Sequence, residues 1–596
     1  MEVKEELTDG LYLANTVCLA IALAVLVKVF LWYRKKVENR RKYEKLQEIG
    51  RKVKATRDAK VQEFLQIHQK DFPSKKRMQE IREEYPSLMS LRQALDSRKI
   101  TSKELVMTYI HQAATEGMEL NALADVMFEE AFQEAQECDK ELQKGNLRGF
   151  LHGIPISFKD QFNIKGTPST IGALACAEDF PEEDGIIAEV LKKHGGIPFA
   201  KTNLPQLMGS AESLTRLWGN CCNPRNPERV SGGSSGGEGA LLGVKGSPIG
   251  IGTDAAGSIR IPCSFCGVFG FKPSYKRMTK LGARDVCQMD ETDGCVEITG
   301  TTGPMGHNVD DLMQIMKIFL SQDVFDKDLT IPPVPFNEDD YDQNPTNLRL
   351  GYFDYDGFFY PCKAVRRSIE ETVSACKKVG IEMVEIEVPN SKEYTDAMAK
   401  FFLGESKRDE IMLQGEPPII EDDPTQYISM LPSFVRNILA SILPHIGMER
   451  ESIFFRALGD PSIGLYLEAC KERRIFERAF NKILDDKELD GFVFPGVSGP
   501  AFKHYKSSEL SAIILITVIA NMIDAPSCVI PVSTVTKEDL AEEYNDPKYP
   551  NDQFVKEARK DWQDSEGMPV GIKVCKRTYE EEKCIGIGKI IESAQK

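Results

Sequence analysis

Residues 231–273 constrain the fold of this chain most, because they interleave clusters of glycine and serine with apolar runs. The first turn, GGSSGG, contains Ser234, and glycine there would let backbone amides approach a ligand because no Cβ stands in the way. The apolar residues 240–244 that follow favour a buried helix. Ser258 lies further along, where the apolar run 249–252 gives way to another turn. We interpret the stretch as a candidate active site.

Two other interpretations of this stretch are weaker. A flexible Gly/Ser linker would not continue into a long segment rich in Leu, Val, Ile and Phe. A phosphate-binding loop would place lysine and then serine or threonine after its last glycine, and both are missing here. The net charge of −16 gives no basis for a nucleic-acid partner. Two serines in glycine-lined turns therefore direct attention to nucleophilic chemistry.

A serine nucleophile needs a base, and none of the seven histidines lies within the stretch. His152, beside GIP, is the nearest candidate, and we interpret it as a surface or strand-edge histidine. Lys159 ends the apolar run GIPISFK, where burial would lower its pKa and make a neutral amine available as base. From the residues alone, an ordinary solvated lysine at a strand end stays open as an alternative.

The three segments GIPISFKD, GGSSGGEGAL and GIGTDAAGSIRIP together resemble the amidase signature family, serine hydrolases with a Ser-Ser-Lys triad, and the resemblance covers roughly residues 95–590. It implies that Ser258 is the nucleophile, Ser234 the bridging serine and Lys159 the base. It implies neither a metal nor an organic cofactor. The implied oxyanion hole consists of the backbone amides of Ala255, Ala256, Gly257 and Ser258.

Two further segments are similar to those of a membrane-bound branch of the same family: DLTIPPVPF (328–336) and VIPVSTVT (529–536). Members of that branch cleave fatty acid amides, such as N-acylethanolamines and primary amides, to fatty acid and amine. The resemblance implies a lipid amide substrate, a membrane and a homodimer as partners. A hydrolase of small amides or esters and a non-catalytic lipid-binding protein remain open as alternatives.

The segment NLPQLMGSAES (203–213) is similar to the part of that branch which lines the acyl pocket, and this places Met208 in the pocket. Gly209 stands where the branch has a bulky aromatic residue, so we expect a wider pocket or one refilled by Phe401 or Phe402. Ala256 stands where many members have glycine. An alanine is costly there if the position needs a positive φ, so we expect either a negative φ or a reshaped oxyanion hole.

The order of predicted elements indicates an α/β fold: one large domain with a mixed β-sheet flanked by helices, spanning residues 95–596. Strand-like segments at 154–158 and 195–202 flank a predicted helix, and 303–320 also has a helical pattern. Thr101 and Glu104 form a predicted capping box at the start of another helix.

The fifteen cysteines are an odd number and follow no disulfide framework, which favours a reducing compartment for the catalytic part. Cys263 and Cys266 form a C-x-x-C in the apolar segment IPCSFCGVF. Because no second C-x-x-C follows at zinc-site spacing, we interpret them as packed thiols.

Residues 11–33 form an apolar run long enough to cross a bilayer as a helix, which needs about 20 residues. Lys28 lies near one end, where its amine can reach the headgroups. The acidic residues 1–10 disfavour a signal peptide and are predicted to lie on the lumenal or exoplasmic side. Basic residues beginning at Arg34 place the catalytic domain in the cytoplasm, as a single-pass protein of the endoplasmic reticulum or another endomembrane.

Two further segments concern the membrane. Residues 34–94 are predicted to be a charged helical linker that lies against headgroups or acts as a solvated spacer. Residues 427–447, interrupted by Pro432 and Pro444, carry one apolar stripe at helical spacing: Leu431, Phe434, Val435, Ile438, Leu439, Ile442 and Ile446. The resemblance implies a hydrophobic membrane cap beside the acyl channel, and a core-facing helix is the alternative.

Overall fold

The computed structural model describes the backbone of all residues except 1, 286–287, 290–291, 294–296, 404–410, 420–427, 429–430, 447, 459–462, 542–551 and 596. Side chains are described except in residues 1–33, 286–296, 392–393, 402–410, 420–427, 429–430, 447, 449, 454, 459–462, 542–551, 553 and 596. The side chain of Phe402 and parts of the predicted cap therefore lie outside the described residues.

The molecule is built on an 11-stranded sheet in the order β1-β3-β2-β6-β10-β7-β14-β15-β13-β11-β12. Its strands are β1 Leu123–Val126, β2 Pro155–Lys159, β3 Ile197–Thr202, β6 Gly250–Asp254, β7 Phe269–Lys272, β10 Thr301–Gly306, β11 Arg349–Tyr352, β12 Glu382–Glu385, β13 Gly491–Pro495, β14 Ser527–Thr534 and β15 Pro569–Cys575. Two small hairpins, β4 Leu214–Thr215 with β5 Gly219–Asn220 and β8 Gln288–Met289 with β9 Thr292–Asp293, lie apart from it.

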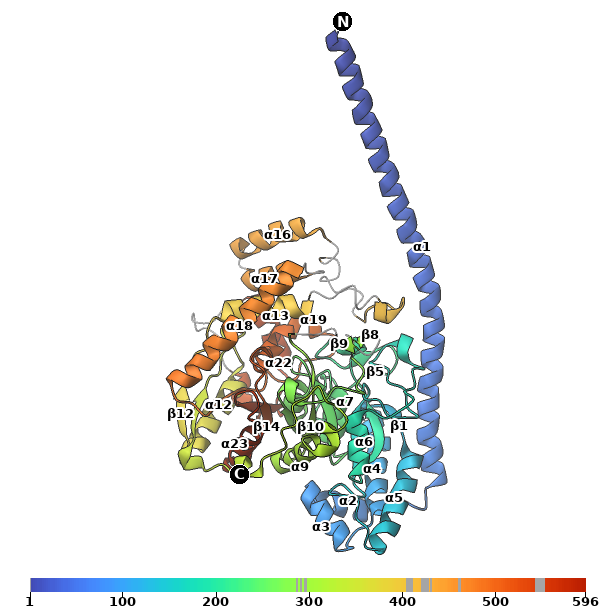
Figure 1. Cartoon of the computed structure of the whole chain (residues 1–596), viewed down its shortest axis with the longest axis vertical. Helices are drawn as coiled ribbons and strands as arrows, with labels where there is room; N and C mark the ends of the chain where they lie inside the picture. Colours follow the sequence, from blue (N-terminus) through green and yellow to red (C-terminus); the bar gives the residue numbers. More distant parts are fainter. Residues whose placement is uncertain are drawn as a thin grey trace.

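The sheet is mixed, as the sequence predicts. Strand β2 pairs in parallel with β3 and β6, and β11 pairs in parallel with β12 and β13. The central strands β10, β7, β14 and β15 pair antiparallel. Helices cover the sheet, so the predicted α/β class is confirmed (Figure 1).

The helices are α1 Glu2–Ile67, α2 Lys75–Glu84, α3 Leu88–Asp96, α4 Ser102–Gln112, α5 Phe128–Gln143, α6 Ile186–Lys193, α7 Gly236–Gly243, α8 Arg260–Cys266, α9 Val309–Phe319, α10 Gln322–Phe325, α11 Glu338–Tyr341, α12 Lys363–Lys378, α13 Ser391–Leu403, α16 Ser433–Ile442, α17 Glu449–Ala457, α18 Ile463–Asp486, α19 Ser507–Leu510, α20 Ile519–Met522, α21 Lys537–Leu540, α22 Gln553–Trp562 and α23 Glu581–Ala594. The predicted capping box of Thr101 and Glu104 is present at the start of α4.

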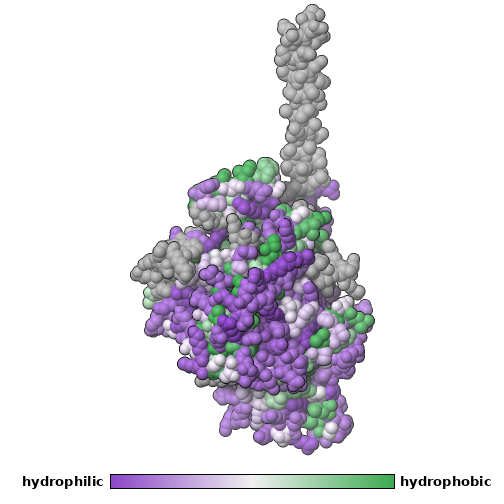
Figure 2. Space-filling view, turned by 60° about the vertical axis from the view of Figure 1, so that its left-hand side comes forward, coloured by the Kyte–Doolittle hydropathy of each residue, from purple (hydrophilic) through white to green (hydrophobic). Residues whose placement is uncertain are grey.

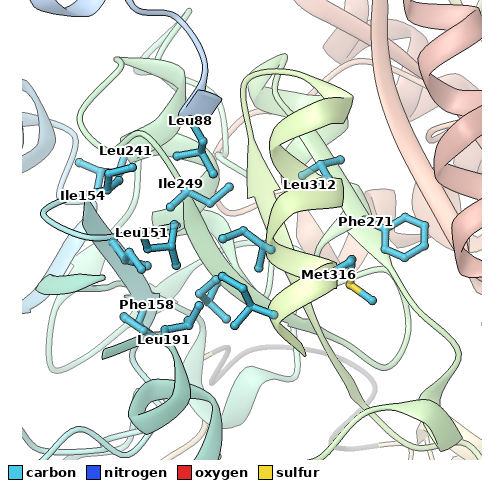
Figure 3. Packing of buried hydrophobic residues seen from close by; sticks show 14 of the residues in the cluster. Leu88, Leu151, Ile154, Phe158, Leu191, Leu241, Ile249, Phe271, Leu312 and Met316 are labelled. Atoms are coloured by element: carbon cyan, nitrogen blue, oxygen red, sulfur yellow. The ribbon is translucent and has the colours of Figure 1, made fainter. Parts of the chain in front are cut away.

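The helical pattern at 303–320 is only partly right. Residues 301–306 form the central strand β10, and α9 begins after Asn308, whose side chain accepts a hydrogen bond from the Asp311 amide. This cap satisfies a free amide of the first turn and fixes where the helix starts. Helix α9 then buries its apolar stripe against the sheet. Figure 3 shows Leu312 and Met316 of α9 in the same buried cluster as Ile249 and Phe271.

Residues 34–67 of α1 dock on the catalytic body rather than forming a solvated spacer. Val61 and Phe64 are buried, and Tyr43, Leu46, Ile49 and Val53 pack against a buried cluster that contains Leu174 and Trp218. A side chain at Gly50 would overlap Leu174. The segment is helical as predicted, but its apolar positions bind it to the protein.

In the part of the chain with described side chains, no helix is long and apolar enough to cross a membrane. Residues 11–33, for which a spanning helix is predicted, lie in α1, and their side chains are outside the described residues.

The apolar stripe of α16 and the 3-10 helix Leu443–Ile446 points outward. Phe434, Ile438, Ile442 and Ile446 are between 50% and 66% exposed. Figure 2 shows hydrophobic side chains gathered at the top of the body, where Figure 1 places α16. The alternative of a core-facing helix is therefore wrong, because these side chains do not reach the core.

Candidate active site

Lys159 ends strand β2 inside the sheet, and its side chain is fully buried. Its Nζ lies 2.6 Å from Ser234 Oγ and 2.8 Å from Thr253 Oγ1. Burial lowers the pKa of Lys159 to about 7, against the opposing effect of nearby carboxylates, of which Asp254 has the largest. The predicted neutral amine therefore has a physical basis, and the solvated alternative is wrong.

Thr253 and Gln161 complete the surroundings of the lysine, and sequence reasoning missed both. Thr253 Oγ1 donates a hydrogen bond of 2.5 Å to Gln161 Oε1, so its oxygen is left to accept from Lys159. The Gln161 Nε2 in turn donates to the Arg284 carbonyl. Their places in the sequence could have indicated both residues. Gln161 follows Lys159 by two residues, and Thr253 lies in the motif that leads to Ser258.

Ser234 lies in the turn before α7 and is 2% exposed. The turn needs glycine at two points: Gly232 has φ 90°, and a side chain at Gly233 would overlap the Ser210 carbonyl. The Gly233–Ser234 peptide bond is cis. The amide of Ser235 donates to the Ser258 carbonyl at 3.0 Å, which joins the two predicted serine turns.

Ser258 lies between β6 and α8 and is partly exposed, in contrast to Lys159 and Ser234. The Asp254 carboxylate shapes its turn by accepting hydrogen bonds from the amides of Gly257 at 2.8 Å and Ile259 at 3.1 Å. Arg260 also donates to this carboxylate, through Nε at 2.9 Å and through its second terminal nitrogen at 2.8 Å. Although burial opposes it, Arg260 holds the pKa of Asp254 well below its usual range. This buried ion pair was not predicted.

The four predicted oxyanion amides are not equivalent. Gly257 donates its amide to Asp254, whereas the amides of Ala255, Ala256 and Ser258 donate no hydrogen bond within the described residues. Gly257 has φ 113°, and a Cβ there would overlap Thr517. Ala256 has no such positive φ, so alanine fits without backbone strain. The amides open to a ligand are therefore those of Ala255, Ala256 and Ser258.

Glu238 on α7 is a further buried carboxyl group close to the lysine. It accepts hydrogen bonds from Ser157 Oγ at 2.6 Å and Thr202 Oγ1 at 2.8 Å. Burial raises the pKa of Glu238 to about 8, so it is largely neutral at pH 7. This neutrality limits the electrostatic pull on Lys159 toward its charged form.

Met208 lies on the 3-10 helix Gln206–Met208 and is partly buried. It packs in an apolar cluster with Ile171, Ala173, Cys176, Leu207, Met412 and Leu413. Gly209 is exposed, and a side chain there would meet only the Gln206 carbonyl at 3.9 Å. Phe401 packs against Tyr466 in a different cluster, so it does not refill the space beside Gly209.

Other candidate groups lie outside this arrangement. His152 is buried, with Nε2 2.9 Å from the Cys138 carbonyl, so the prediction of a surface or strand-edge histidine is wrong. Cys263 and Cys266 are buried free thiols whose pKa values burial raises, as the packing interpretation predicts. Among the described residues, no group of His, Cys, Asp or Glu could hold a metal ion.

The sequence matches the profile of the Amidase family over residues 104–585. It is 30% identical over 508 residues to fatty-acid amide hydrolase 1 of Sus scrofa, covering 85% of each chain. It is 30% identical to fatty acid amide hydrolase 1 of Caenorhabditis elegans, covering 85% of this chain and 87% of that protein. It is also 28% identical to the acetamidase of Emericella nidulans, covering 87% of this chain and 91% of that protein.

Solved structures agree on the fold. A fatty acid amide hydrolase superimposes with a TM-score of 0.72 at 24% identity, covering 85% of each chain. A bacterial aryl acylamidase of the amidase signature family superimposes with a TM-score of 0.66 at 18% identity, covering 86% of this chain and 96% of that one. Because the family profile spans most of the sequence and the fold agrees, this chain belongs to the amidase signature family and is an enzyme that hydrolyses amides.

Proposed function

We propose that this protein is a membrane-bound serine hydrolase that cleaves fatty acid amides, such as anandamide and oleamide, to fatty acid and amine. Ser258 is the nucleophile, Ser234 the bridging serine and Lys159 the base. The observation that carries the proposal is the buried Lys159 amine, whose Nζ lies 2.6 Å from Ser234 Oγ and whose pKa is lowered to about 7. Such an amine is a proton acceptor at neutral pH.

The proton relay follows from the hydrogen bonds of the neutral amine. A neutral amine has two N–H donors and one lone pair, and the Thr253 oxygen takes one of these donors. The lone pair is then available to the Ser234 hydroxyl proton. As Ser234 gives its proton to Lys159, its oxygen accepts the proton of Ser258, and the Ser258 oxygen attacks the substrate carbonyl.

The oxyanion that forms is stabilised by the open amides of Ala255, Ala256 and Ser258. When this intermediate collapses, the relay runs in reverse and protonates the leaving amine. Water then attacks the acyl ester on Ser258, with the same relay taking its proton, and the fatty acid is released. The Asp254 carboxylate, held by Arg260, binds the turn that carries these amides.

The substrate class is supported by the apolar cluster around Met208 and by the names of two relatives, fatty acid amide hydrolases that are each 30% identical. A hydrolase of small amides is the second candidate. The 28% identity to an acetamidase, at similar coverage, favours it.

Membrane attachment is proposed through two elements. Residues 11–33 would span the bilayer once, which the apolar sequence alone supports. The exposed stripe of α16 would lie in the cytoplasmic leaflet, since α1 extends past the body toward the side where α16 lies (Figure 1). The catalytic domain would then face the cytoplasm at the endoplasmic reticulum or another endomembrane. A homodimer is proposed by family resemblance, and sedimentation in detergent would test it.

A panel of amides tests the proposed function. Purified enzyme in detergent should hydrolyse oleamide and palmitoyl amides with a higher kcat/KM than acetamide or propionamide. A mass-spectrometric search of the trapped enzyme should find the acyl chain on Ser258. An enzyme that prefers acetamide would establish the small-amide alternative, and an enzyme that hydrolyses neither class would refute both.

A further inference from the structure

Residues 411–419, here called the strap, lie between helix α1 and the 3-10 helix Gln206–Met208. Figure 1 shows the strap as a short gold segment beside α1. Gly415 has φ 100°, and a Cβ there would lie 3.2 Å from the Asn39 carbonyl and 3.4 Å from Lys42 Cβ, both on α1. The strap therefore lies in direct contact with the helix that carries the predicted membrane segment.

Gln206 and Glu416 hold the other side of the strap. Gln206 Nε2 donates to Glu416 Oε1 at 2.7 Å, and the Ile419 amide donates to Gln206 Oε1 at 2.9 Å. The second oxygen of Glu416 accepts from the Leu174 amide at 2.7 Å. Glu416 is 3% exposed, so these bonds form away from water, where an unpaired carboxylate would be costly.

Arg216 connects the strap to α1 a second time. Its guanidinium donates to the Pro417 carbonyl at 3.3 Å and to the Pro418 carbonyl at 2.9 Å. The same guanidinium lies 5.7 Å from the centre of the Tyr43 ring on α1. A displacement of α1 would therefore shift the strap through its contacts with both Arg216 and Gly415.

The segment held by the strap also touches the catalytic turn. Two and three residues after Met208, the Ser210 carbonyl and the Ala211 backbone pack on Gly233 so closely that no Cβ would fit. Ser213 Oγ donates to the Gly232 carbonyl at 2.9 Å. The segment that follows Gln206 thus packs against the turn that carries Ser234.

The strap itself contributes apolar side chains to the cluster around Met208. Leu413 is 3% exposed and Met412 is partly buried, and both pack in the cluster that contains Leu207 and Met208. Methionine is unbranched and adaptable, so small shifts of the strap would reshape this wall. The two methionines come from segments about two hundred residues apart in sequence, and the hydrogen bonds between Gln206 and the strap help to hold these segments together.

We propose that the strap sets the acyl-chain selectivity of the enzyme, with Gln206 and Glu416 as its positioning residues and docked α1 as its outer support. The inference rests on the proposed function, because it assigns the wall beside Met208 to the acyl chain. It makes residues 34–67 of α1 part of the substrate-binding unit rather than only a stalk. Neither positioning residue takes part in proton transfer.

An exchange of the two positioning residues, Gln206 and Glu416, tests the proposal in the full-length enzyme in detergent. Gln206→Glu alone sets two carboxylates against each other, and Glu416→Gln alone leaves too few acceptors for the Gln206 Nε2 and the Leu174 amide. In the double variant, the amide at 416 donates to the carboxylate at 206, and acceptors again face the amides of Leu174 and Ile419. The double variant should therefore restore most of what either single change loses, since the Pro417 carbonyl, which loses Gln206 Nε2 as a donor at 3.3 Å, still accepts from Arg216.

The readout is the ratio of kcat/KM for palmitoyl and octanoyl p-nitroanilides. Each single variant should change this ratio by about tenfold, mainly through KM for the longer chain, with kcat for the shorter chain within about twofold. The double variant should return the ratio to within about threefold of wild type.

Asp311→Ala is the matched control. Asp311, on α9, is a buried carboxyl group that also accepts from one backbone amide, that of Leu88, and from one side-chain amide, that of Asn308. Its loss should lower the melting temperature and leave the chain-length ratio unchanged. Single variants that alter stability but not the ratio, or a double variant that fails to restore it, would overturn the inference. Wild-type enzyme inactive on both anilides would instead remove the proposed function itself.

Discussion

Two regions of this molecule reverse the usual distribution of side chains. Around the catalytic turn, ionisable groups are fully buried: Lys159, Glu238, Asp254 and Arg260. On α16 and the 3-10 helix after it, large apolar groups are at least half exposed: Phe434, Ile438, Ile442 and Ile446. Either arrangement costs free energy, since buried ionisable groups lose hydration and exposed apolar surface orders water.

The two regions differ in where the compensation comes from. Asp254 accepts hydrogen bonds from Arg260 and two amides, and Glu238 accepts from two hydroxyls, so the chain compensates its own buried groups. The described part of the chain leaves half or more of each of these stripe side chains uncovered. Buried ionisable groups that the chain itself satisfies are typical of a catalytic site. An exposed apolar patch is typical of a surface that binds another molecule or a membrane.

The largest effect on activity is expected from a substitution of Ser258, the partly exposed residue of the catalytic turn. Ser258→Ala removes the proposed nucleophile and should lower kcat for a fatty acid amide by about 10³-fold or more, because no other hydroxyl can form the acyl ester. A fluorophosphonate probe should label wild type and leave this variant unlabelled. Ser264→Ala, which removes a buried hydroxyl bonded to the Arg260 carbonyl, is the control and should still be labelled. Stoichiometric labelling of Ser258→Ala would show that another residue is the nucleophile.

Lys159 should follow in size. Lys159→Ala should lower kcat by about 10²- to 10⁴-fold, the usual contribution of a general base. Because burial lowers the pKa of Lys159 to about 7, the amine is protonated and inactive below that pH. Wild-type kcat/KM should therefore rise as pH increases through 7 and level off above it. The variant should lack this rise, and an identical rise in both enzymes would assign it to another group.

The same pKa shift has a consequence for stability. Unfolded Lys159 binds its proton up to about pH 10.4, whereas the folded form releases it near pH 7. Between these values the unfolded state holds more protons, so the free energy of unfolding gains a term that grows with pH. Urea titrations at pH 7 and pH 9 should show this increase in wild type and a smaller one in Lys159→Met.

A fourth prediction compares α16 with α9, two helices that both carry an apolar stripe. Ile315→Glu on α9 places a carboxylate in the core and should destabilise the protein by about 3 kcal/mol or more. Ile438→Glu with Ile442→Glu on α16 should leave the melting temperature nearly unchanged. It should slow hydrolysis of vesicle-borne amides about fivefold while sparing a soluble short-chain amide.

The matched control for α16 adds the same charges beside the stripe, as Asn437→Glu with Ser441→Glu, both at exposed positions. This control should affect vesicle-borne substrate less than the stripe variant does. Equal effects of the two variants would mean that net charge, not apolar contact, governs access. If the stripe variant unfolds, the stripe of α16 contributes to the core, as that of α9 does, and the membrane proposal for α16 is wrong.

The three motifs of the candidate site could be recognised in the sequence because each encodes local structure. A strand end at Lys159, a glycine turn at Ser234 and a second turn at Ser258 each follow from nearby residues, and the fold brings them together. Periodicity likewise identified α9 and α16 as helices. It could not tell which one is buried, since both carry an apolar stripe and only the surrounding elements decide what the stripe contacts.

Contacts between segments that are distant in sequence could not be predicted from the sequence. The strap's partners, Gln206 and α1, lie far from Glu416 in sequence, and no spacing rule links them. The pairing of Asp254 with Arg260 had a usable signal, because two opposite charges flank Ser258 within an apolar segment. The strand at 301–306 was missed because its small, glycine-containing sequence runs directly into a helical pattern.

The smallest expected effect concerns Ala256, which lies within the buried region but is not strained. Because Ala256 lacks a positive φ, replacing it with glycine relieves nothing and only adds freedom to the unfolded chain, which costs about 0.5–1 kcal/mol. Ala256→Gly should therefore keep kcat/KM within about threefold of wild type and lower the melting temperature slightly. Gly257→Ala is the contrasting control, since its Cβ would overlap Thr517 at φ 113°, and it should disrupt the turn. A large gain in kcat for Ala256→Gly would mean that the Ala256 amide is held away from the oxyanion, contrary to the geometry of this turn.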